Sequence, residues 1–127
     1  MKNSIIEYLF ETQSKYPNKI AFEDSDGRKL TFTQLKSEAE RIGAFLIKTF
    51  NCTKKPVVVL TERNIKSIPA FLGTVFSGNF YIPVDATLPD SRIEEMLNIA
   101  NPIIAASTIN IFIPFFFIYL FYLYNFN

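Results

Sequence analysis

Along its first hundred or so residues, the chain alternates between a helical spacing of hydrophobic positions and short extended runs. Near the amino terminus, apolar residues recur on one helix face, at Ile5, Ile6, Leu9 and Phe10. Ser4 and Glu7 match a capping box, in which each side chain satisfies a backbone N–H at the other position. Pro17 cannot continue a helix, so we expect this helix to end before it.

Two short β-prone runs follow, over residues 20–23 and 28–32, with Asp-Ser-Asp-Gly between them. Gly27 accepts the positive φ of a tight turn, and the pattern therefore predicts a β-hairpin. Thr31 and Gln34 form a second capping box, which opens the most regular helical pattern of the chain. Its apolar positions are separated by three or four residues: Leu35, Ala39, Ile42, Leu46 and Phe50.

Residues 56–61 are apolar at consecutive positions rather than at alternating ones. This pattern is typical of a parallel strand that is covered on both faces. We expect Asn64 to cap a further helix that ends at Ser77 and Gly78. Pro69 lies within this pattern and is expected to kink the helix or to delay its start.

A short strand is predicted over residues 79–85, and Pro89 opens a last helix that Asn101 and Pro102 end. The order of elements is helix, hairpin, helix, buried strand, helix, short strand, helix. This order predicts an α/β fold with a partial parallel sheet and flanking helices. We expect a right-handed parallel crossover between the buried strand and the short strand.

The distribution of charge divides the chain into two unlike parts. All 25 charged residues lie at or before Glu95, and the last 32 residues have none. Nine of the twenty aromatic residues fall in the last sixteen positions, where no periodicity of 3.6 or 2 residues defines a buried face. We therefore predict two units, an α/β segment over residues 1–106 and an uncharged hydrophobic aromatic tail over residues 107–127.

The composition excludes several classes of site. The chain has no histidine and a single cysteine, Cys52, which excludes an internal disulfide, a Cys/His zinc site and catalysis through histidine. The net charge of +1 does not indicate the concentrated basic surface that nucleic-acid binding requires. We interpret the basic pairs Lys54-Lys55 and Arg63 with Lys66 as solvated loop ends. Cys52 itself is interpreted as a loop or packing residue, since no base is available to activate it.

Two groups of carboxylates are the remaining candidates for chemistry. Glu23, Asp24 and Asp26 cluster at the predicted hairpin turn, and we interpret them as turn residues rather than as an acid/base pair. Asp85, directly after the second parallel strand, is expected to cap a turn or to pair with Arg92. The competing interpretation, a magnesium ligand, lacks an accompanying phosphate-binding loop.

The order of these motifs resembles that of the adenylate-forming (AMP-binding) enzymes, over roughly residues 3–106. Leu30-Thr31-Phe32-Thr33-Gln34-Leu35 is similar to the first core motif of that family. Residues 75–85 are similar to the second, with a glycine, an aromatic residue and Pro83-Val84-Asp85. The segment from Pro89 to Pro102 resembles the region that follows. By pattern, the nearest subgroups are the adenylation domains of nonribosomal peptide synthetases and the D-alanine–carrier-protein ligases.

The resemblance implies an amino-terminal part of an enzyme that joins a carboxylic or amino acid to AMP and then transfers the acyl group to a thiol. For the intact family it implies ATP and magnesium, a carrier-protein phosphopantetheine or coenzyme A as partner, and a cytoplasmic location. The family's glycine-rich Pro-Lys-Gly loop has no counterpart here, because Ala105-Ala106-Ser107-Thr108 contains neither glycine nor lysine. The sequence therefore assigns no catalytic, cofactor-binding or metal-binding residue, and we expect this chain alone to be inactive.

The uncharged tail has two interpretations. Residues 103–124 are long enough for a membrane helix, which needs about 20 apolar residues, although Pro114 and Asn110 interrupt them. The runner-up function is accordingly a small noncatalytic α/β interaction protein anchored to a membrane. We favour the second interpretation, in which the tail is read-through or out-of-frame sequence, because Phe, Ile, Leu, Tyr and Asn have codons rich in A and T.

Overall fold

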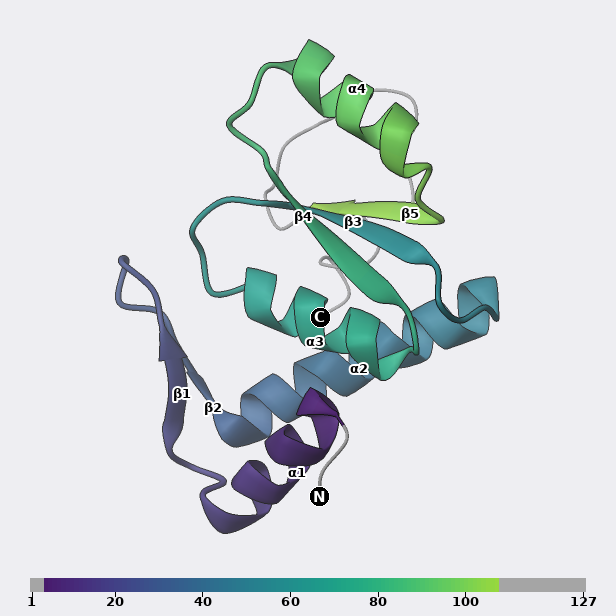
Figure 1. Ribbon diagram of the computed structural model, residues 1–127. Coiled ribbons are helices and arrows are strands. Elements are labelled where there is room, and N and C mark those ends of the chain that lie inside the picture. Colours follow the sequence, from purple (N-terminus) through teal and green to yellow (C-terminus); the bar gives the residue numbers. More distant parts are fainter. Residues whose placement is uncertain (1–3, 108–127) are drawn as a thin grey trace.

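The computed structural model describes residues 4–107 of the 127-residue chain. Helices and strands alternate along it in an α/β arrangement (Figure 1). The elements are α1 (Ile5–Lys15), β1 (Ile20–Glu23), β2 (Lys29–Thr31), α2 (Phe32–Phe50), β3 (Pro56–Thr61), α3 (Ser67–Phe76), β4 (Phe80–Asp85), α4 (Asp90–Ala100) and β5 (Ile104–Ser107).

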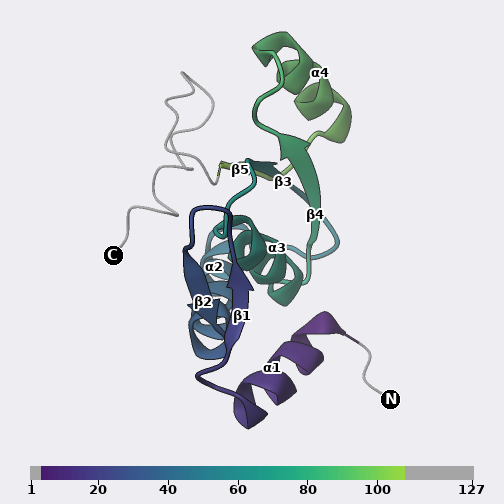
Figure 2. The ribbon, with the colours of Figure 1, turned by 90° about the vertical axis from the view of Figure 1, so that its left-hand side faces the viewer.

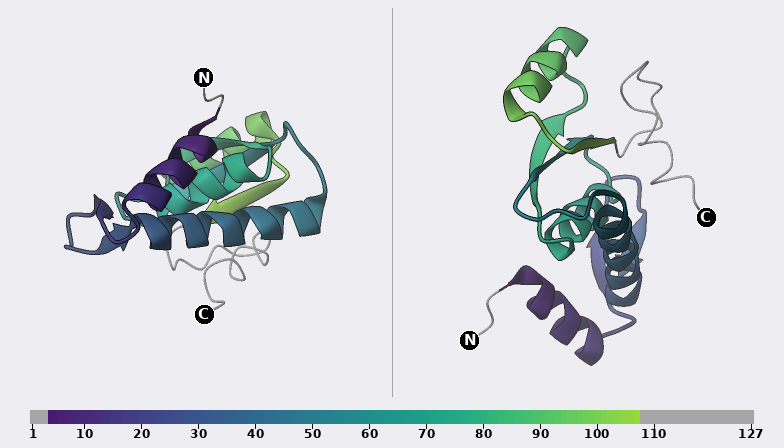
Figure 3. Two further views of the ribbon diagram at one scale, coloured as in Figure 1. Left: turned by 90° about the horizontal axis from the view of Figure 1, so that it is seen from below. Right: turned by 90° about the vertical axis from the view of Figure 1, so that its right-hand side faces the viewer.

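The central element is β3, which pairs in parallel with β4 on one side and with β5 on the other. Its run of apolar residues is explained by burial on both faces. Val57 and Val59 pack toward α2 and α3, whereas Val58 and Leu60 pack toward α4. Figures 2 and 3 show the resulting layers, with α4 on one side of the sheet and α2 and α3 on the other. The predicted fold class, with a partial parallel sheet and flanking helices, is confirmed.

The capping signals place the first helices where the sequence predicts them. Ser4 caps α1 by accepting a hydrogen bond from the Glu7 N–H at 3.3 Å. At α2 both halves of the capping box form, with the Gln34 N–H on the Thr31 hydroxyl at 3.2 Å and the Thr31 N–H on the Gln34 side chain at 2.9 Å. Because these bonds satisfy backbone groups that a helix start leaves open, they mark the start of each helix.

The predicted hairpin is also confirmed. Strands β1 and β2 pair antiparallel, and Gly27 in the turn adopts a φ of 78°. This two-stranded sheet is separate from the parallel sheet and lies beside α2 (Figure 2). Ala21 and Leu30 of the hairpin pack against a further cluster of buried helix residues, which consists of Leu9, Leu35, Ala39 and Leu72.

The start of α3 differs from the prediction. The helix begins at Ser67, with Lys66 as its N-cap and no side-chain cap bond. Asn64 instead caps a turn before the helix, since its side-chain oxygen accepts from the Lys66 N–H at 2.9 Å. Pro69 lies in the first helical turn, where its missing N–H leaves no hydrogen bond unmade, so the expected delay of the helix start is confirmed.

Strand β5 was not predicted. Ile104 and Ala105 are buried against β3, and the backbone ladder continues to Ser107, which pairs with Leu60. Four residues without alternation give no strand signal, and it is the neighbouring β3 that orders them. The strand therefore runs one residue beyond the predicted boundary at 106, and residues 104–107 of the predicted membrane span are strand rather than helix.

The rest of the predicted tail and of the predicted 103–124 span lies outside the described residues. Within residues 4–107, no helix has the length and apolar character that crossing a membrane requires.

Helices α2 and α3 approach each other closely at two glycines. A Cβ on Gly73 would lie 2.6 Å from the Ile42 Cβ and 2.9 Å from the Ala39 carbonyl oxygen. A Cβ on Gly43 would overlap the Cδ1 atom of Phe76 and lie 3.0 Å from both the Phe76 Cγ and the Gly73 carbonyl oxygen. Any larger residue at either position would therefore push the helices apart.

We predict that Gly73→Ala lowers the free energy of unfolding by about 1–3 kcal/mol through overpacking. The loss should appear although alanine favours a helix interior by about 1 kcal/mol over glycine. Gly43→Ala should also lower the free energy of unfolding, because the nearest Phe76 atoms, Cγ and Cδ1, lie next to that residue's backbone, and the Gly73 carbonyl oxygen is itself backbone. Urea unfolding of the full chain measures the stability of both variants, and Ser37→Ala at an exposed position of α2 is the control. A Gly73→Ala variant that is as stable as this control contradicts the prediction.

Candidate functional site

The carboxyl ends of the three parallel strands meet at one edge of the sheet. Thr61 at the end of β3 is in register with Asp85 at the end of β4, and Leu60 is in register with Ser107 at the end of β5. In open α/β sheets, ligands bind outside the carboxyl ends of the strands. We therefore take this edge, with the loops that follow β3 and β4, as the candidate functional site.

Asp85 caps the turn after β4, as the sequence predicts. One of its side-chain oxygens accepts from the Thr87 N–H at 2.9 Å and from the Thr87 hydroxyl at 2.7 Å. The alternative prediction, a pair with Arg92, is wrong, because Arg92 pairs with Glu95 at 2.6 Å on the same helix. Spacings of three or four residues along a helix bring such side chains together, whereas Asp85 belongs to the preceding turn.

The hydrogen bonds from Thr87 keep Asp85 ionised. The bond from the Thr87 hydroxyl has the largest effect on the pKa of Asp85, followed by the bond from the Thr87 N–H. Desolvation opposes them and the positive charge of Arg63 adds to them, so that the pKa lies below its ordinary value of 3.8. The carboxylate therefore serves as an acceptor in a turn, with its proton-binding capacity reduced.

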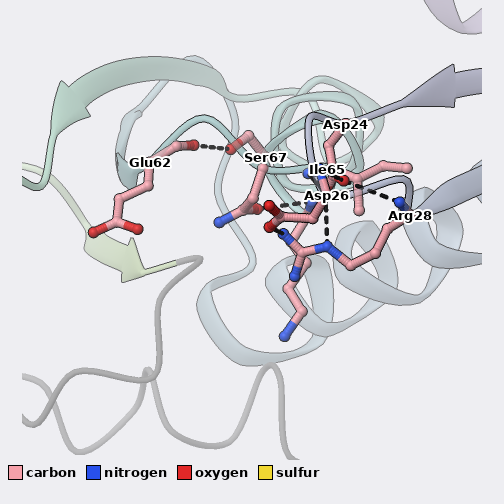
Figure 4. Close-up of polar contacts among 8 residues, drawn as sticks. Asp24, Asp26, Arg28, Glu62, Ile65 and Ser67 are labelled. Atoms are coloured by element: carbon pink, nitrogen blue, oxygen red, sulfur yellow. Dashed lines mark hydrogen bonds and ion pairs between the residues drawn. The ribbon is translucent and has the colours of Figure 1, made fainter.

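Hydroxyl groups hold the loop that follows β3. Thr61 and Ser67 hydrogen-bond to each other through their hydroxyls, and both lie within hydrogen-bond distance of the Glu62 carbonyl oxygen, at 2.6 and 3.3 Å. Figure 4 shows the contact between Glu62 and Ser67. Ser67 is buried, and its hydroxyl is engaged with backbone and with Thr61. This cluster shapes the loop, and it lacks a base that would activate either hydroxyl as a nucleophile.

Asp24 links the hairpin to the same loop. The Asp24 side chain is 6% exposed and accepts four hydrogen bonds, three from its own turn and one from the Ile65 N–H at 3.3 Å (Figure 4). The prediction that these are turn residues holds for Asp26, which pairs with Arg28 at 3.1 Å. Glu23 is instead the last residue of β1 and pairs with Lys29 on the opposite strand at 4.0 Å. The prediction missed the contact between Asp24 and Ile65, which are 41 residues apart in the sequence.

The environment of Asp24 also favours its charged form. Burial raises the pKa of Asp24, but hydrogen bonds from the N–H and the side chain of Arg28 lower it, as do those from the N–H groups of Ile65 and Asp26. The net result is a pKa below the ordinary value of 3.8. With its oxygens occupied by donors, this carboxylate is not arranged as one member of an acid/base pair.

All four glycines of the chain have structural positions. Gly27 and Gly78 adopt positive φ in turns, while Gly43 and Gly73 lie at the contact between two helices. Lys54, in the loop before β3, donates its backbone N–H to the Gly78 carbonyl at 2.8 Å. Among residues 4–107 there is also no group of three or more His, Cys, Asp or Glu that could hold a metal ion.

Asn79 is a structural residue that sequence reasoning did not single out. It is buried at the amino end of β4, where its amide nitrogen donates to the Cys52 carbonyl at 3.1 Å and to the Ser77 hydroxyl at 2.9 Å. Its side-chain oxygen accepts from the Lys55 N–H at 3.0 Å. The signal for it was its place after Gly78, in the second motif. Cys52 participates through its backbone, consistent with its interpretation as a loop residue.

Comparison with known proteins bears on the whole of this arrangement. The family model described as "AMP-binding enzyme" matches residues 9–106. A D-alanine--D-alanyl carrier protein ligase from Listeria monocytogenes serotype 4b (strain CLIP80459) is 37% identical over 103 residues, which are 80% of this chain and 20% of that protein. The chain thus spans about a fifth of the length of the curated relatives it matches.

Solved structures share the fold. The nonribosomal peptide synthetase FmoA3 in its AMPPNP-bound form superposes with a TM-score of 0.75 at 28% identity, covering 80% of this chain and 11% of that one. The Klebsiella oxytoca NpsA N-terminal subdomain with 3-hydroxybenzoyl-AMSN has a TM-score of 0.74 at 21% identity, over 87% and 28% of the two chains. The arrangement of α1 to β5 is therefore that of the amino-terminal part of adenylation domains.

We predict that Asp85 stabilises the fold in a pH-dependent way. Because its folded-state pKa is lowered, its contribution is present above the ordinary pKa and is lost as the pH falls through the folded value. Asp85→Ala should therefore lower the urea midpoint at neutral pH, and the difference from the unsubstituted chain should shrink as the pH falls below the ordinary pKa of 3.8.

The exposed Glu94→Ala on α4 is the matched control and should show a smaller effect at neutral pH. A difference for Asp85→Ala that stays constant from neutral to acid pH contradicts this role.

Proposed function

The chain belongs to the AMP-binding enzyme family, and from that premise we propose that it provides the supporting α/β part of an adenylation module. The module would activate a carboxylic or amino acid with ATP. The observation that supports this most directly is the coincidence of the family match, residues 9–106, with the folded elements from α1 to β5.

Both family motifs serve the fold. In the first motif, Thr31 and Gln34 close the capping box that starts α2. In the second, Gly78 turns the chain, Asn79 ties two loops together, and Asp85 caps the turn after β4. These residues set the direction and the ends of the elements that border the carboxyl edge of the sheet. We infer that this part of the chain contributes shape rather than reacting groups.

The residues of this part do not fit ATP or magnesium, which the family implies. Its glycines lie in turns and at a helix contact, and the hydroxyls and carboxylates near the sheet edge already bind one another and the backbone. Phosphate cradles use successive free backbone N–H groups, commonly with a lysine. We therefore assign ATP and magnesium binding to residues other than 4–107 and derive no catalytic step from the described ones.

For the whole module we propose the family's two-step reaction. The carboxylate oxygen of the acid attacks the α-phosphorus of ATP, pyrophosphate leaves, and the acyl-adenylate forms. A thiolate then attacks the acyl carbon, AMP leaves, and the thiol and the acyl group are joined as a thioester. Relatives named as D-alanine--D-alanyl carrier protein ligases support a carrier protein as the partner of the second step. We propose that the thiol is its phosphopantetheine, with coenzyme A as the alternative, and that the module is cytoplasmic.

We propose that the adenylation part and the tail are separate units, 1–106 and 107–127, with the boundary directly before Ser107, the last residue of β5. The tail has no charge, and most of the span proposed for the anchored interaction protein lies outside the described residues. Sequencing the transcript distinguishes a tail that is encoded in frame from read-through sequence.

A chimera tests the supporting role. Residues 9–106 would replace the matching segment of the Listeria ligase, which is 37% identical. We expect D-alanine-dependent ATP–pyrophosphate exchange within roughly tenfold of the parent ligase, equivalent to about 1.4 kcal/mol in the barrier, because the reacting groups come from the recipient. The same chimera with Gly73→Ala, which disturbs helix packing, serves as a control for a damaged scaffold. A chimera that folds like the parent but shows no exchange contradicts the proposal.

The complementary prediction concerns the chain by itself. We expect no ATP–pyrophosphate exchange with any of the twenty standard amino acids or with D-alanine, because the described residues provide no phosphate cradle. The assay follows labelled pyrophosphate entering ATP, with the parent Listeria ligase as positive control. Exchange above background by the purified 127-residue chain would overturn the proposal that this chain alone is inactive.

A further inference from the structure

The contacts of Asp24 have a feature that turn chemistry alone does not require. Four N–H donors converge on its two carboxylate oxygens. Oδ1 accepts from the backbone N–H groups of Asp26 and Arg28, both at 3.0 Å. Oδ2 accepts from the Arg28 Nε at 2.7 Å and from the Ile65 N–H at 3.3 Å. One oxygen thus serves the turn alone, and the other joins the hairpin to the loop between β3 and α3.

We propose that Asp24 is a latch that holds the β1–β2 hairpin on the loop of residues 62–66 and so sets the conformation of that loop beside the carboxyl edge of the sheet. Asp24 is a positioning residue in this proposal, because it acts through the loop. The proposal is independent of which reaction the module carries out.

The carboxylate is the side chain that fits this arrangement. An asparagine has one acceptor oxygen and one NH₂ group, so if its oxygen serves the turn, its NH₂ group faces the Arg28 Nε and the Ile65 N–H, which are both donors. A protonated aspartate has the same difficulty, because one oxygen then carries a hydrogen. Loss of the negative charge therefore releases the loop even when the shape of the side chain is kept.

The loop has restraints of its own, including the buried side chain of Ile65, and Asp24 adds a contact from the hairpin to the Ile65 N–H. Thr61 and Ser67 hold the Glu62 carbonyl at the start, and Asn64 turns the chain ahead of α3, a helix without a side-chain cap. The hairpin turn has Asp26 and Arg28 beside Asp24, and the charged residues of the loop are Glu62, Arg63 and Lys66. Of these, Arg28 bonds directly to Asp24, and Asp26 shares the same guanidinium.

The experiment compares Asp24→Asn with Asp26→Asn in the full chain by amide hydrogen exchange. Asp26 is the matched control, since it lies two residues away and pairs with the same arginine, but its side chain is 72% exposed and has no bond to Ile65. In Asp24→Asn we expect exchange at the Ile65 N–H to rise by about tenfold or more, while Val58 in the central strand keeps the unsubstituted rate. Asp26→Asn should change neither.

Three results would overturn the latch. In the first, Ile65 exchange is unchanged in a folded Asp24→Asn. In the second, Asp26→Asn raises it equally, which would assign the effect to the charge of the turn. In the third, Ile65 and Val58 accelerate by the same factor, which would make Asp24 a contributor to global stability only. If Asp24→Asn fails to fold, Asp24→Glu, which keeps the charge, is compared with Asp24→Gln; equal Ile65 rates in these two overturn the proposal as well.

Discussion

The contact between α2 and α3 at Gly43 and Gly73 is the constraint on which the rest of the structure depends. Without side chains at these positions, the Ile42 side chain and the Ala39 backbone of α2 lie directly on α3. The two helices then form one layer that covers Val57 and Val59 of the central strand. Helix α1 packs on this layer through Leu9, and β2 leads directly into α2 through the capping box at its start. A wider separation of the two helices would displace the hairpin and α1 as well as the core.

Burial of β3 on both faces follows from this layer and from α4 on the other side. Because β3 is the middle strand, it determines where β4 and β5 end, and all three ends meet at one edge. The polar residues at that edge are engaged in shaping turns, through Asp85 with Thr87 and Thr61 with Ser67. A sheet edge of this kind can support a binding site whose reacting groups come from other residues.

The hairpin has a second connection to this edge through Asp24. Its carboxylate lies in a turn of the small antiparallel sheet, yet it accepts from the loop that follows the central parallel strand. Two sheets that share no strand are thus joined by one ionised side chain. The motif segments of the family have a comparable role, since Asn79 joins the loop before β3 to the turn before β4. Hydrogen bonds between loops, rather than strand pairing, determine how the two ends of the sheet are shaped.

The sequence by itself determined the helices α1, α2 and α4, the hairpin, the central strand and the family, because caps, turn glycines and hydrophobic spacing act between residues near one another in the chain. It also identified Asp85 as a turn cap. Tertiary structure alone decided the start of α3, the strand β5, the contact of Asp24 with Ile65 and the function of Gly43 and Gly73. Each of these depends on a partner that is distant in the sequence: β3 orders β5, a loop 41 residues away completes the contacts of Asp24, and a second helix makes glycine necessary. A local pattern contains no information about such partners until the chain has folded.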